Sequence, residues 1–177
     1  MVERLSPDFF DRPTLDVAKD LLGKILVFGE HVGVITETEA YIGQNDPACH
    51  AARGKTGRNA VMFGPSGVSY VYFIYGMYHC LNIVTEEEGT PAAVLIRGLM
   101  LLRPEPLFLN GPGKLCRHLG ITRDHNGIDL NLSDSFLLKD SPLSPQYEAT
   151  PRIGISKGQE KLWRFVVKKN PKKVRTF

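Results

Sequence analysis

Cysteine is scarce in this sequence and is not arranged in pairs. The chain has 177 residues and three cysteines, Cys49, Cys80 and Cys116, with no Cys-x-x-Cys motif, so no disulfide framework is indicated and a reducing compartment fits best. His50 follows Cys49 and His79 precedes Cys80, but neighbouring residues on a strand point to opposite faces and none of the usual zinc spacings occurs. We therefore expect no metal and no cofactor.

Long apolar runs are also missing. The stretch 92–102 is short and contains Arg97, and 70–84 carries His79 and Asn82, so neither reaches the roughly 20 apolar residues of a membrane-spanning helix. The first ten residues show no apolar signal region. The sequence predicts a soluble, unexported protein without a membrane partner.

Several nucleotide-binding and hydrolase motifs are absent or incomplete. Residues 111–114, Gly-Pro-Gly-Lys, lack the upstream glycine and the following Ser or Thr of a phosphate-binding loop. No serine lies in a Gly-x-Ser-x-Gly setting, and no cysteine has a base partner at a recognisable spacing. A nucleoside-triphosphate site and a serine or cysteine nucleophile are therefore not expected.

The composition is that of an ordinary globular protein, with 42% apolar and 23% charged residues, 17 Gly and 12 Pro. A chain of this length buries roughly 70% of its unfolded surface and supports one core. We expect a single domain that spans residues 1–177.

Charge is distributed unevenly, although the net charge is only +3. From residue 152 onward a single acidic residue, Glu160, accompanies nine basic residues. These are Arg152, Lys157, Lys161, Arg164, Lys168, Lys169, Lys172, Lys173 and Arg175. Such a segment is either an electrostatic footprint for a polyanion or a solvated basic tail, and charge alone does not decide between them.

Strands outnumber helices in the pattern of apolar residues and turn signals. Helices are predicted over 13–23, with Thr14 as N-cap, and over 114–119, closed by Gly120. Strands are predicted over 24–28, 32–42, 68–75, 77–84, 92–97 and 162–167. Residues 43–59 lack periodicity and predict a long loop, which inside a compact domain is usually functional or disordered. The run from 68 to 97 predicts an antiparallel meander.

One predicted strand carries candidate chemistry. Alternation along 32–42 puts Glu37, Glu39 and Tyr41 on one face. With His50, Arg97 and the tyrosine-rich run 70–78, these groups could hold a flat heteroaromatic ring, because stacking supplies affinity and polar groups read the ring edge. The alternative is that the glutamates face solvent on an edge strand and the tyrosines are ordinary sheet residues.

Seven segments, in order, resemble the alkyladenine DNA glycosylases, the mammalian type of 3-methyladenine DNA glycosylase. The resemblance runs from residue 9 to about 165 and rests on Glu-Thr-Glu-Ala-Tyr at 37–41, Asp-Pro-Ala-Cys-His at 46–50, Arg-Asn-Ala-Val-Met-Phe at 58–63, Tyr-Val-Tyr-Phe-Ile-Tyr-Gly-Met at 70–77, Cys-Leu-Asn at 80–82, Val-Leu-Ile-Arg at 94–97 and Asn-Gly-Pro-Gly-Lys-Leu at 110–115. It implies a mixed α/β fold, one compact domain on a curved antiparallel sheet with flanking helices and no helix-hairpin-helix. The sequence departs from the family at Gly57, Gly98 and Met100.

The resemblance also implies site residues. Glu39 matches the catalytic glutamate, Arg97 the arginine that helps to hold the attacking water, and Ile153 the residue whose backbone carbonyl also holds it. The residues that match the pocket for a flipped base are Tyr41, His50, Tyr72 and Asn82. His50 would also contact the base edge, and Asn82 would exclude a guanine amino group. Tyr75 matches the tyrosine that enters the duplex, and Arg58, Lys114, Lys168 and Lys169 are the expected contacts to the DNA backbone.

The activity implied is that of a monofunctional DNA glycosylase in base excision repair. It would flip 3-methyladenine, other alkylpurines, hypoxanthine or ethenoadenine out of duplex DNA and hydrolyse the N-glycosidic bond. We expect a monomer located with the DNA, in the cytoplasm of a bacterium or the nucleus of a eukaryote. The competing prediction is a non-catalytic module that binds single-stranded or damaged nucleic acid by stacking on tyrosines. Glu39 separates the two, because a pure binder has no use for an acid opposed to phosphate.

Overall fold

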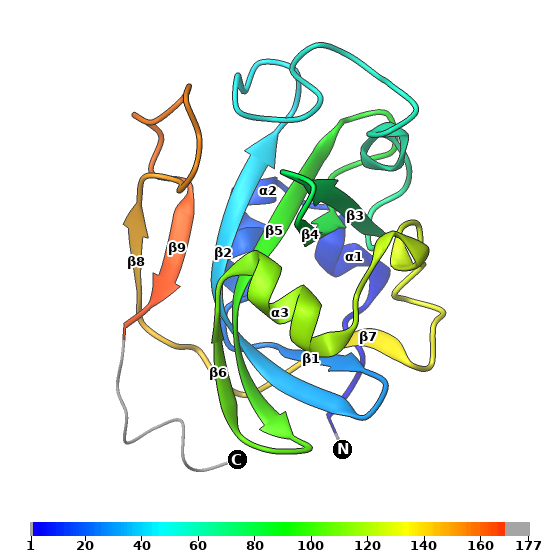
Figure 1. Cartoon of the computed structure of the whole chain (residues 1–177), viewed down its shortest axis with the longest axis vertical. Helices are drawn as coiled ribbons and strands as arrows, with labels where there is room; N and C mark the ends of the chain where they lie inside the picture. The colour runs from blue at the N-terminus through cyan, green and yellow to red at the C-terminus, as the bar shows by residue number, and fades with distance from the viewer. Residues whose placement is uncertain (1, 169–177) are drawn as a thin grey trace.

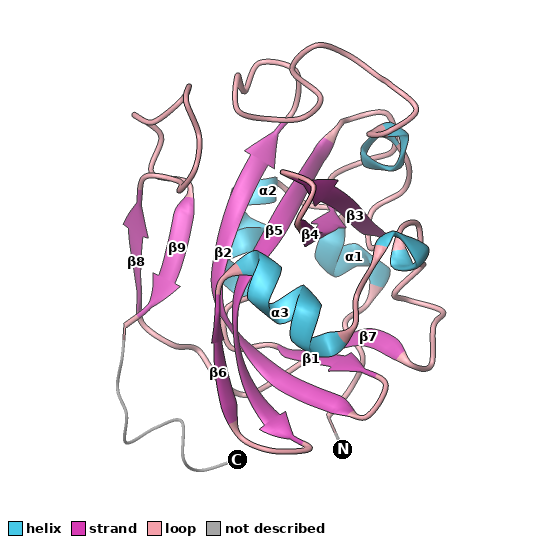
Figure 2. Ribbon diagram, in the orientation of Figure 1, coloured by secondary structure: helices cyan, strands magenta, loops and turns pink. Residues whose placement is uncertain are grey.

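An antiparallel sheet of nine strands organises residues 2–168, the part of the chain that this computed structural model describes (Figure 1). The main path runs β3-β4-β5-β2-β1-β7, with β6 paired to β5 and β9 paired to β2 and β8. The strands are β1 Ile25–Phe28, β2 His31–Ile42, β3 Ser69–Ile74, β4 Tyr78–Val84, β5 Ala92–Arg103, β6 Leu107–Asn110, β7 Phe136–Lys139, β8 Tyr147–Thr150 and β9 Arg164–Val167. The sheet curls, and the β8–β9 hairpin forms one side of the molecule (Figure 2).

Three short α-helices and two 3-10 helices accompany the sheet within the described residues. They are α1 Pro7–Phe10, α2 Thr14–Asp20, α3 Pro112–Leu119, η1 Ala60–Phe63 and η2 Arg123–His125. In Figure 1, α1 and α2 lie behind the central strands and α3 crosses in front of them. The predicted fold class, a mixed α/β fold on a curved antiparallel sheet, is confirmed.

The two faces of the central strands carry different side chains because successive residues alternate. On one face Ala40, Val71, Leu81, Val94 and Ile96 belong to the main core with α2. There Val17, Ala18 and Leu21 are fully buried, and Thr38 Oγ1 donates to the Ala18 carbonyl at 2.8 Å. The opposite face carries a second cluster of mostly aromatic and small side chains, among them Tyr70, Tyr72, Cys80 and Leu95. That face holds the candidate site.

Two predictions about helix ends are wrong in detail. The first major helix covers Thr14–Asp20 and not 13–23, and Pro13 stands at the N-cap position while Thr14 is already helical. The Thr14 hydroxyl is engaged with the side chains of Thr85 and Glu86 and does not cap its own helix. The second helix begins at Pro112, because proline fits the first turn of a helix, and Gly120 closes it in the left-handed conformation as predicted.

The hairpins predicted over 24–42 and 68–84 are confirmed, and residues 43–59 contain no helix or strand. The strand predicted over 92–97 continues to Arg103 and pairs with β6, which the sequence did not predict. β7 and β8 were also missed. β7 is mostly Leu and Lys and β8 contains Glu and Ala, residues with little preference for strands, and β8 is largely exposed.

Paired irregularities in β2 and β5 shape the region of Glu37. Ile35 pairs with Leu99, Glu37 with Gly98 and Thr38 with Ile96, which leaves Thr36 and Arg97 outside the pairing. The carbonyl of Arg97 instead accepts a hydrogen bond from Gly111 N at 2.9 Å, just before α3. Arg97 faces the second cluster as Leu95 does two positions before it, and the irregularity that follows lets Leu99 return to the main core.

Candidate active site

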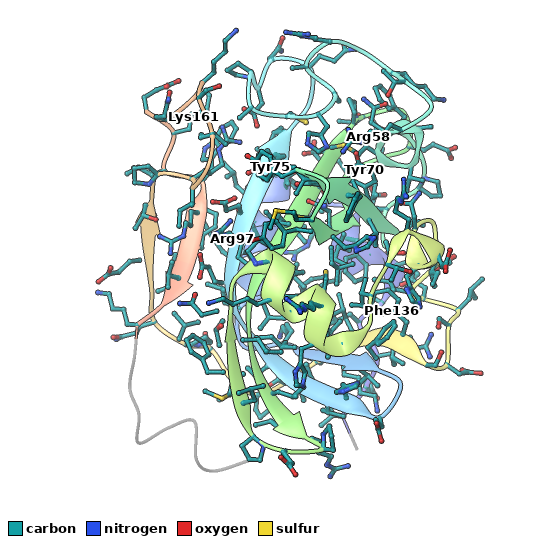
Figure 3. The ribbon with its side chains drawn as sticks, in the orientation of Figure 1. Arg58, Tyr70, Tyr75, Arg97, Phe136 and Lys161 are labelled. Carbon is teal, nitrogen blue, oxygen red and sulfur yellow. The ribbon has the colours of Figure 1, made fainter. Side chains whose placement is uncertain are left out.

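A cavity of about 390 Å³ opens on the aromatic face of the sheet. Alternate residues of four strands form its floor, and the loop 43–59, α3 and the segment after β8 complete its walls. Its main lining residues are Glu39, Tyr41, His50, Tyr70, Tyr72, Tyr75, Tyr78, Cys80, Asn82, Arg97, Lys114 and Ile153. Figure 3 shows Tyr70, Tyr75 and Arg97 gathered over the central strands. The cavity therefore brings together all the residues predicted for catalysis, base binding and intercalation.

Glu39 on β2 is shielded from bulk solvent, with an exposed fraction of 0%. Its Oε1 accepts a hydrogen bond from Tyr41 Oη at 2.8 Å, and its Oε2 accepts one from the Ile153 backbone N–H at 2.7 Å. Arg97 Nη1 lies 3.7 Å from Oε1. Both carboxylate oxygens are thus held in fixed directions at the cavity floor.

Burial raises the pKa of Glu39 above its ordinary value of 4.5, and this effect outweighs the lowering by Arg97, by the Ile153 N–H and by the Tyr41 hydroxyl. A carboxylate with a raised pKa is a stronger base, and the three donors limit how far burial raises the pKa of Glu39.

Aromatic rings enclose the space above Glu39. The His50 and Tyr72 rings meet at an angle of 64° with their centroids 4.2 Å apart. Tyr72 is buried, and burial raises its pKa, so its hydroxyl stays protonated. Tyr41 presents its ring to the cavity while its hydroxyl binds Glu39. A flat ligand that enters here meets π-faces on its sides and the carboxylate at its end.

His50 is held in one orientation by a tyrosine that the predictions did not list as a site residue. His50 Nδ1 and Tyr70 Oη are 3.0 Å apart, and Tyr70 is buried. Surrounding atoms and the nearby Arg58 lower the pKa of His50, so the ring is neutral at neutral pH. Either His50 Nδ1 or Tyr70 Oη donates in this hydrogen bond, depending on which ring nitrogen carries the proton. Tyr70 stands two positions before Tyr72 on β3 and so shares its face, and this spacing is the sequence signal that could have identified Tyr70 as a site residue.

Asn82 and Cys80 stand two positions apart on β4 and therefore face the same side of the sheet. Asn82 is buried, and its Nδ2 donates to the Tyr70 carbonyl at 3.2 Å, so its side chain is fixed where it borders the cavity. Burial raises the pKa of the Cys80 thiol, which keeps it protonated and unreactive.

Tyr75 occupies the tip of the β3–β4 hairpin. Its φ is 55° and that of Gly76 is 62°, both in the left-handed region, and Met77 N donates to the Ile74 carbonyl at 3.1 Å to close this tight turn. A non-glycine residue rarely adopts this conformation, and it costs about 1–2 kcal/mol. Tyr75 is 74% exposed, and Met77 beside it is also exposed. The hairpin therefore holds a large aromatic ring in solvent at the cavity mouth, against both backbone and hydrophobic preference.

A buried ion pair links the loop to the segment that carries Ile153. Asp46 and Arg152 are 1% and 4% exposed, and two hydrogen bonds of 2.6 and 2.9 Å join them. Arg152 Nη1 also donates to the Ala40 carbonyl at 2.9 Å, and its guanidinium lies 4.8 Å from the centre of the Tyr41 ring. One arginine thus holds the start of the loop, packs behind the Tyr41 ring and fixes the backbone next to Ile153.

Comparison with known proteins decides the family. A family model described as methylpurine-DNA glycosylase matches residues 8–171. The chain belongs to this family. It is 65% identical over 161 residues to a protein of Sodalis glossinidius named "Putative 3-methyladenine DNA glycosylase", covering 91% of this chain and 95% of that one.

Two further relatives carry the same name. The protein of Wolbachia sp. subsp. Brugia malayi (strain TRS) is 63% identical over 165 residues, 93% of this chain and 98% of its own. That of Rickettsia felis is 58% identical over 163 residues, 92% of both chains. As a methylpurine-DNA glycosylase, the protein is a hydrolase that acts on DNA in the repair of alkylation damage. The prediction of an enzyme, and not of a non-catalytic binding module, is confirmed.

The glycosylase carries its predicted backbone-contact residues in separate places. Arg58 is exposed on the loop beside the β3–β4 hairpin, where it donates to the Phe73 carbonyl, and Lys114 is exposed in the first turn of α3. Lys168 follows β9 and is exposed, whereas Lys169 lies outside the described residues.

The basic C-terminal segment is not one uniform surface. Arg152 is buried against Asp46, and Arg164 is bonded to Glu37, so neither is available to a polyanion. Arg152 and Arg164 were predicted as part of the basic segment because their acidic partners lie more than 100 positions away along the chain. Lys172, Lys173 and Arg175 lie outside the described residues.

Within residues 2–168, no three His, Cys, Asp or Glu side chains converge to hold a metal ion. No helix in the same part of the chain is long and apolar enough to cross a membrane.

The Asp46–Arg152 pair gives a prediction about stability. Asp46→Asn leaves a buried guanidinium without its counter-charge, which costs about 3–5 kcal/mol in comparable pairs. We expect the free energy of unfolding, measured with urea at pH 7, to fall by that amount. Asp20→Asn breaks the exposed pair with Arg12, at 2.9 Å, and serves as the control with an expected loss below about 1 kcal/mol. Equal losses in the two variants would show that the buried pair has no special role.

Proposed function

We propose that this protein is a monofunctional glycosylase that takes a damaged purine out of duplex DNA into the cavity and hydrolyses its N-glycosidic bond. The observation that carries the proposal is the buried Glu39 carboxylate at the end of an aromatic-walled cavity, held by Tyr41, Arg97 and the Ile153 N–H. The substrates proposed are 3-methyladenine, other alkylpurines, hypoxanthine and ethenoadenine.

Glu39 is proposed to orient and deprotonate the attacking water, a contribution of about 10² to 10⁴ in rate. Its negative charge also stabilises the oxocarbenium-like sugar of the transition state. Arg97 keeps the carboxylate ionised and helps to hold the water. The carbonyl of Ile153 is proposed as a further acceptor for that water, which its N–H bond to Glu39 supports by placing the residue beside the carboxylate.

The base is proposed to stack between Tyr41 and Tyr72, with His50 at its edge. Stacking contributes roughly 1–3 kcal/mol per base. A neutral His50 adds no positive charge beside the base, so a cationic alkylpurine is not repelled. Such a base is already a good leaving group, and one carboxylate is then sufficient for the chemistry.

Extruding the base costs a few kcal/mol, least for a weakly paired lesion, and Tyr75 offsets part of this cost by filling the gap in the stack. Its exposure and its fixed turn support this role, because the ring does not have to leave a core or choose among turn conformations. Lone exposed aromatics are common, but a strained one at a cavity mouth needs a reason.

Arg58, Lys114, Lys168 and Lys169 are proposed to contact phosphates without reading sequence. We propose that the chain acts as a monomer, with residues 1–177 as one domain, in the compartment that holds the DNA. Strand cleavage through a Schiff base is not part of the proposal, because the strands that line the cavity contribute no lysine to it.

The function is tested with duplex DNA that carries one hypoxanthine or one alkylated purine, followed by alkali to reveal abasic sites. Wild-type protein is expected to release the base, and Glu39→Gln to bind the lesion without releasing it, because the amide has nearly the same shape but takes no proton. Glu148→Gln removes an exposed carboxylate from β8 and should act like wild type. Substantial turnover by Glu39→Gln would show that Glu37, and not Glu39, activates the water.

Tyr75→Ser should weaken capture of the flipped state more than the chemistry that follows, because a small side chain does not fill the gap. The measurement compares lesion affinity with single-turnover rates at saturating protein. Met77→Ser, which changes the other exposed side chain of the same tip, is the control and should have the smaller effect. A single-turnover rate reduced as steeply as that of Glu39→Gln would refute the wedge role.

Asn82 is proposed to refuse the exocyclic amino group by which guanine differs from hypoxanthine. A clash or an unpaired buried amine costs about 1–3 kcal/mol, enough for roughly a ten- to hundredfold preference. Asn82→Ser should therefore release undamaged guanine from duplex DNA while still removing hypoxanthine. Free guanine is measured by chromatography after long incubation, with Glu39→Gln as the blank. Release no higher than by wild type would show that Asn82 is not the gate.

A further inference from the structure

Arg97 has a closer partner than Glu39. Its Nε donates to Glu37 Oε1 at 3.0 Å, whereas its Nη1 stays 3.7 Å from Glu39 Oε1. The same Glu37 oxygen accepts a hydrogen bond from Arg164 Nε at 2.6 Å. Glu37 is buried between two guanidinium groups, and none of the roles proposed above uses it.

The backbone is built to admit Glu37 at this place. Gly98 stands opposite Glu37 in the irregular pairing of β2 and β5. A Cβ at Gly98 would lie 2.9 Å from Glu37 Cβ and 2.6 Å from Thr36 Oγ1, closer than side chains tolerate. The missing side chain at 98 thus lets the two strands approach and sets the Glu37 carboxylate beside the Nε of Arg97.

Glu37 also connects the site with the β8–β9 hairpin. Arg164 lies on β9, and its Nη1 donates to Thr150 Oγ1 at 3.0 Å at the end of β8. Three residues later the chain reaches Ile153, whose N–H binds Glu39. Two routes therefore run from Glu37 to Glu39, one through Arg97 and one through Arg164 and the segment 150–153.

We propose that Glu37 is a positioning residue for base release, which holds Arg97 by its Nε so that the guanidinium faces Glu39 without closing into a tight ion pair with it. The proposal rests on the glycosylase function proposed above. A carboxylate in a close pair with arginine is a weak base, and one left without any cation in a buried site takes up a proton. By sharing the charge of Arg97, Glu37 keeps the Glu39 carboxylate from becoming either a weak base or a protonated acid.

Glu37→Gln removes the shared charge, so Arg97 is compensated by Glu39 alone and the gap between them should close. We expect the pKa of Glu39 to fall and the single-turnover rate at neutral pH to drop about 10- to 100-fold, the usual consequence of a misplaced catalytic group. The acid limb of the pH profile should move to lower pH.

Glu37→Asp keeps the buried charge balance and secures a folded variant. Its shorter reach should lower the rate while moving the acid limb less.

Arg164→Gln is the matched comparison, because it leaves the Glu37–Arg97 contact in place. It should slow base release through the segment that carries Ile153 and, because it loosens the Ile153 N–H on Glu39, move the Glu39 titration upward, in the opposite direction to Glu37→Gln. Glu148→Gln removes an exposed β8 carboxylate and should change neither quantity.

The experiment follows the Glu39 side-chain carboxyl by carbon-13 NMR in the free protein against pH, alongside single-turnover rates on DNA with an alkylated purine. A downward shift of the Glu39 titration in Glu37→Gln, with a parallel shift of the acid limb, supports the proposal. A rate loss with both titrations unchanged would overturn it and leave Glu37 a merely structural residue. If wild type released no base while the NMR shift occurred, the glycosylase function would fail and the control of Glu39 by Glu37 would stand.

Discussion

Keeping the carboxylate of Glu39 charged inside an apolar sheet is the constraint on which the rest of the site depends. Burial favours the neutral acid, and three groups oppose it: the Arg97 guanidinium, the Ile153 N–H and the Tyr41 hydroxyl. Each comes from a different part of the chain. The register of β5 against β2, the segment after β8 and the alternation of β2 each bring one donor to this carboxylate.

The same constraint explains why polar groups are buried around the site in linked pairs. Arg152 and Asp46 compensate each other behind Tyr41. Glu37 lies between Arg97 and Arg164 and accepts a hydrogen bond from each. An uncompensated charge in either place would change the field at Glu39. The charge at the cavity therefore depends on ion pairs that also stabilise the fold. Tyr75 is a second local cost, because it is exposed and strained at the mouth of the cavity.

Local patterns were sufficient for much of the fold. Alternation along β2 placed Glu37, Glu39 and Tyr41 on one face, and the turn at Gly76 followed from the interruption between the predicted strands 68–75 and 77–84. β7 and β8 were missed because they contain Leu, Lys, Glu and Ala, which favour strands little, whereas β1 and β9 of the same length are rich in Ile, Val and Phe. Arg152 and Arg164 were assigned to a basic surface because nothing near them in the sequence reveals Asp46 or Glu37.

The roles of individual site residues came from family resemblance, and residue spacing alone left them open beside the structural alternative. Pairwise contacts across more than 100 positions, such as Ile153 with Glu39, depend on the curl of the sheet and are not readable from periodicity. The net direction of the Glu39 pKa was likewise beyond the sequence, because burial competes with charge and only coordinates give the burial.

The central claim, that a buried Glu39 with a raised pKa activates water, is tested most directly by the pH dependence of base release. Single-turnover rates on duplex DNA with a permanently cationic alkylpurine avoid any change in the leaving group, and blanks without protein correct for spontaneous loss. The rate should rise with pH through a midpoint above 4.5, the ordinary value for glutamate, and then level off. A rate that is independent of pH down to that value, or that falls as pH rises through this range, would contradict the account.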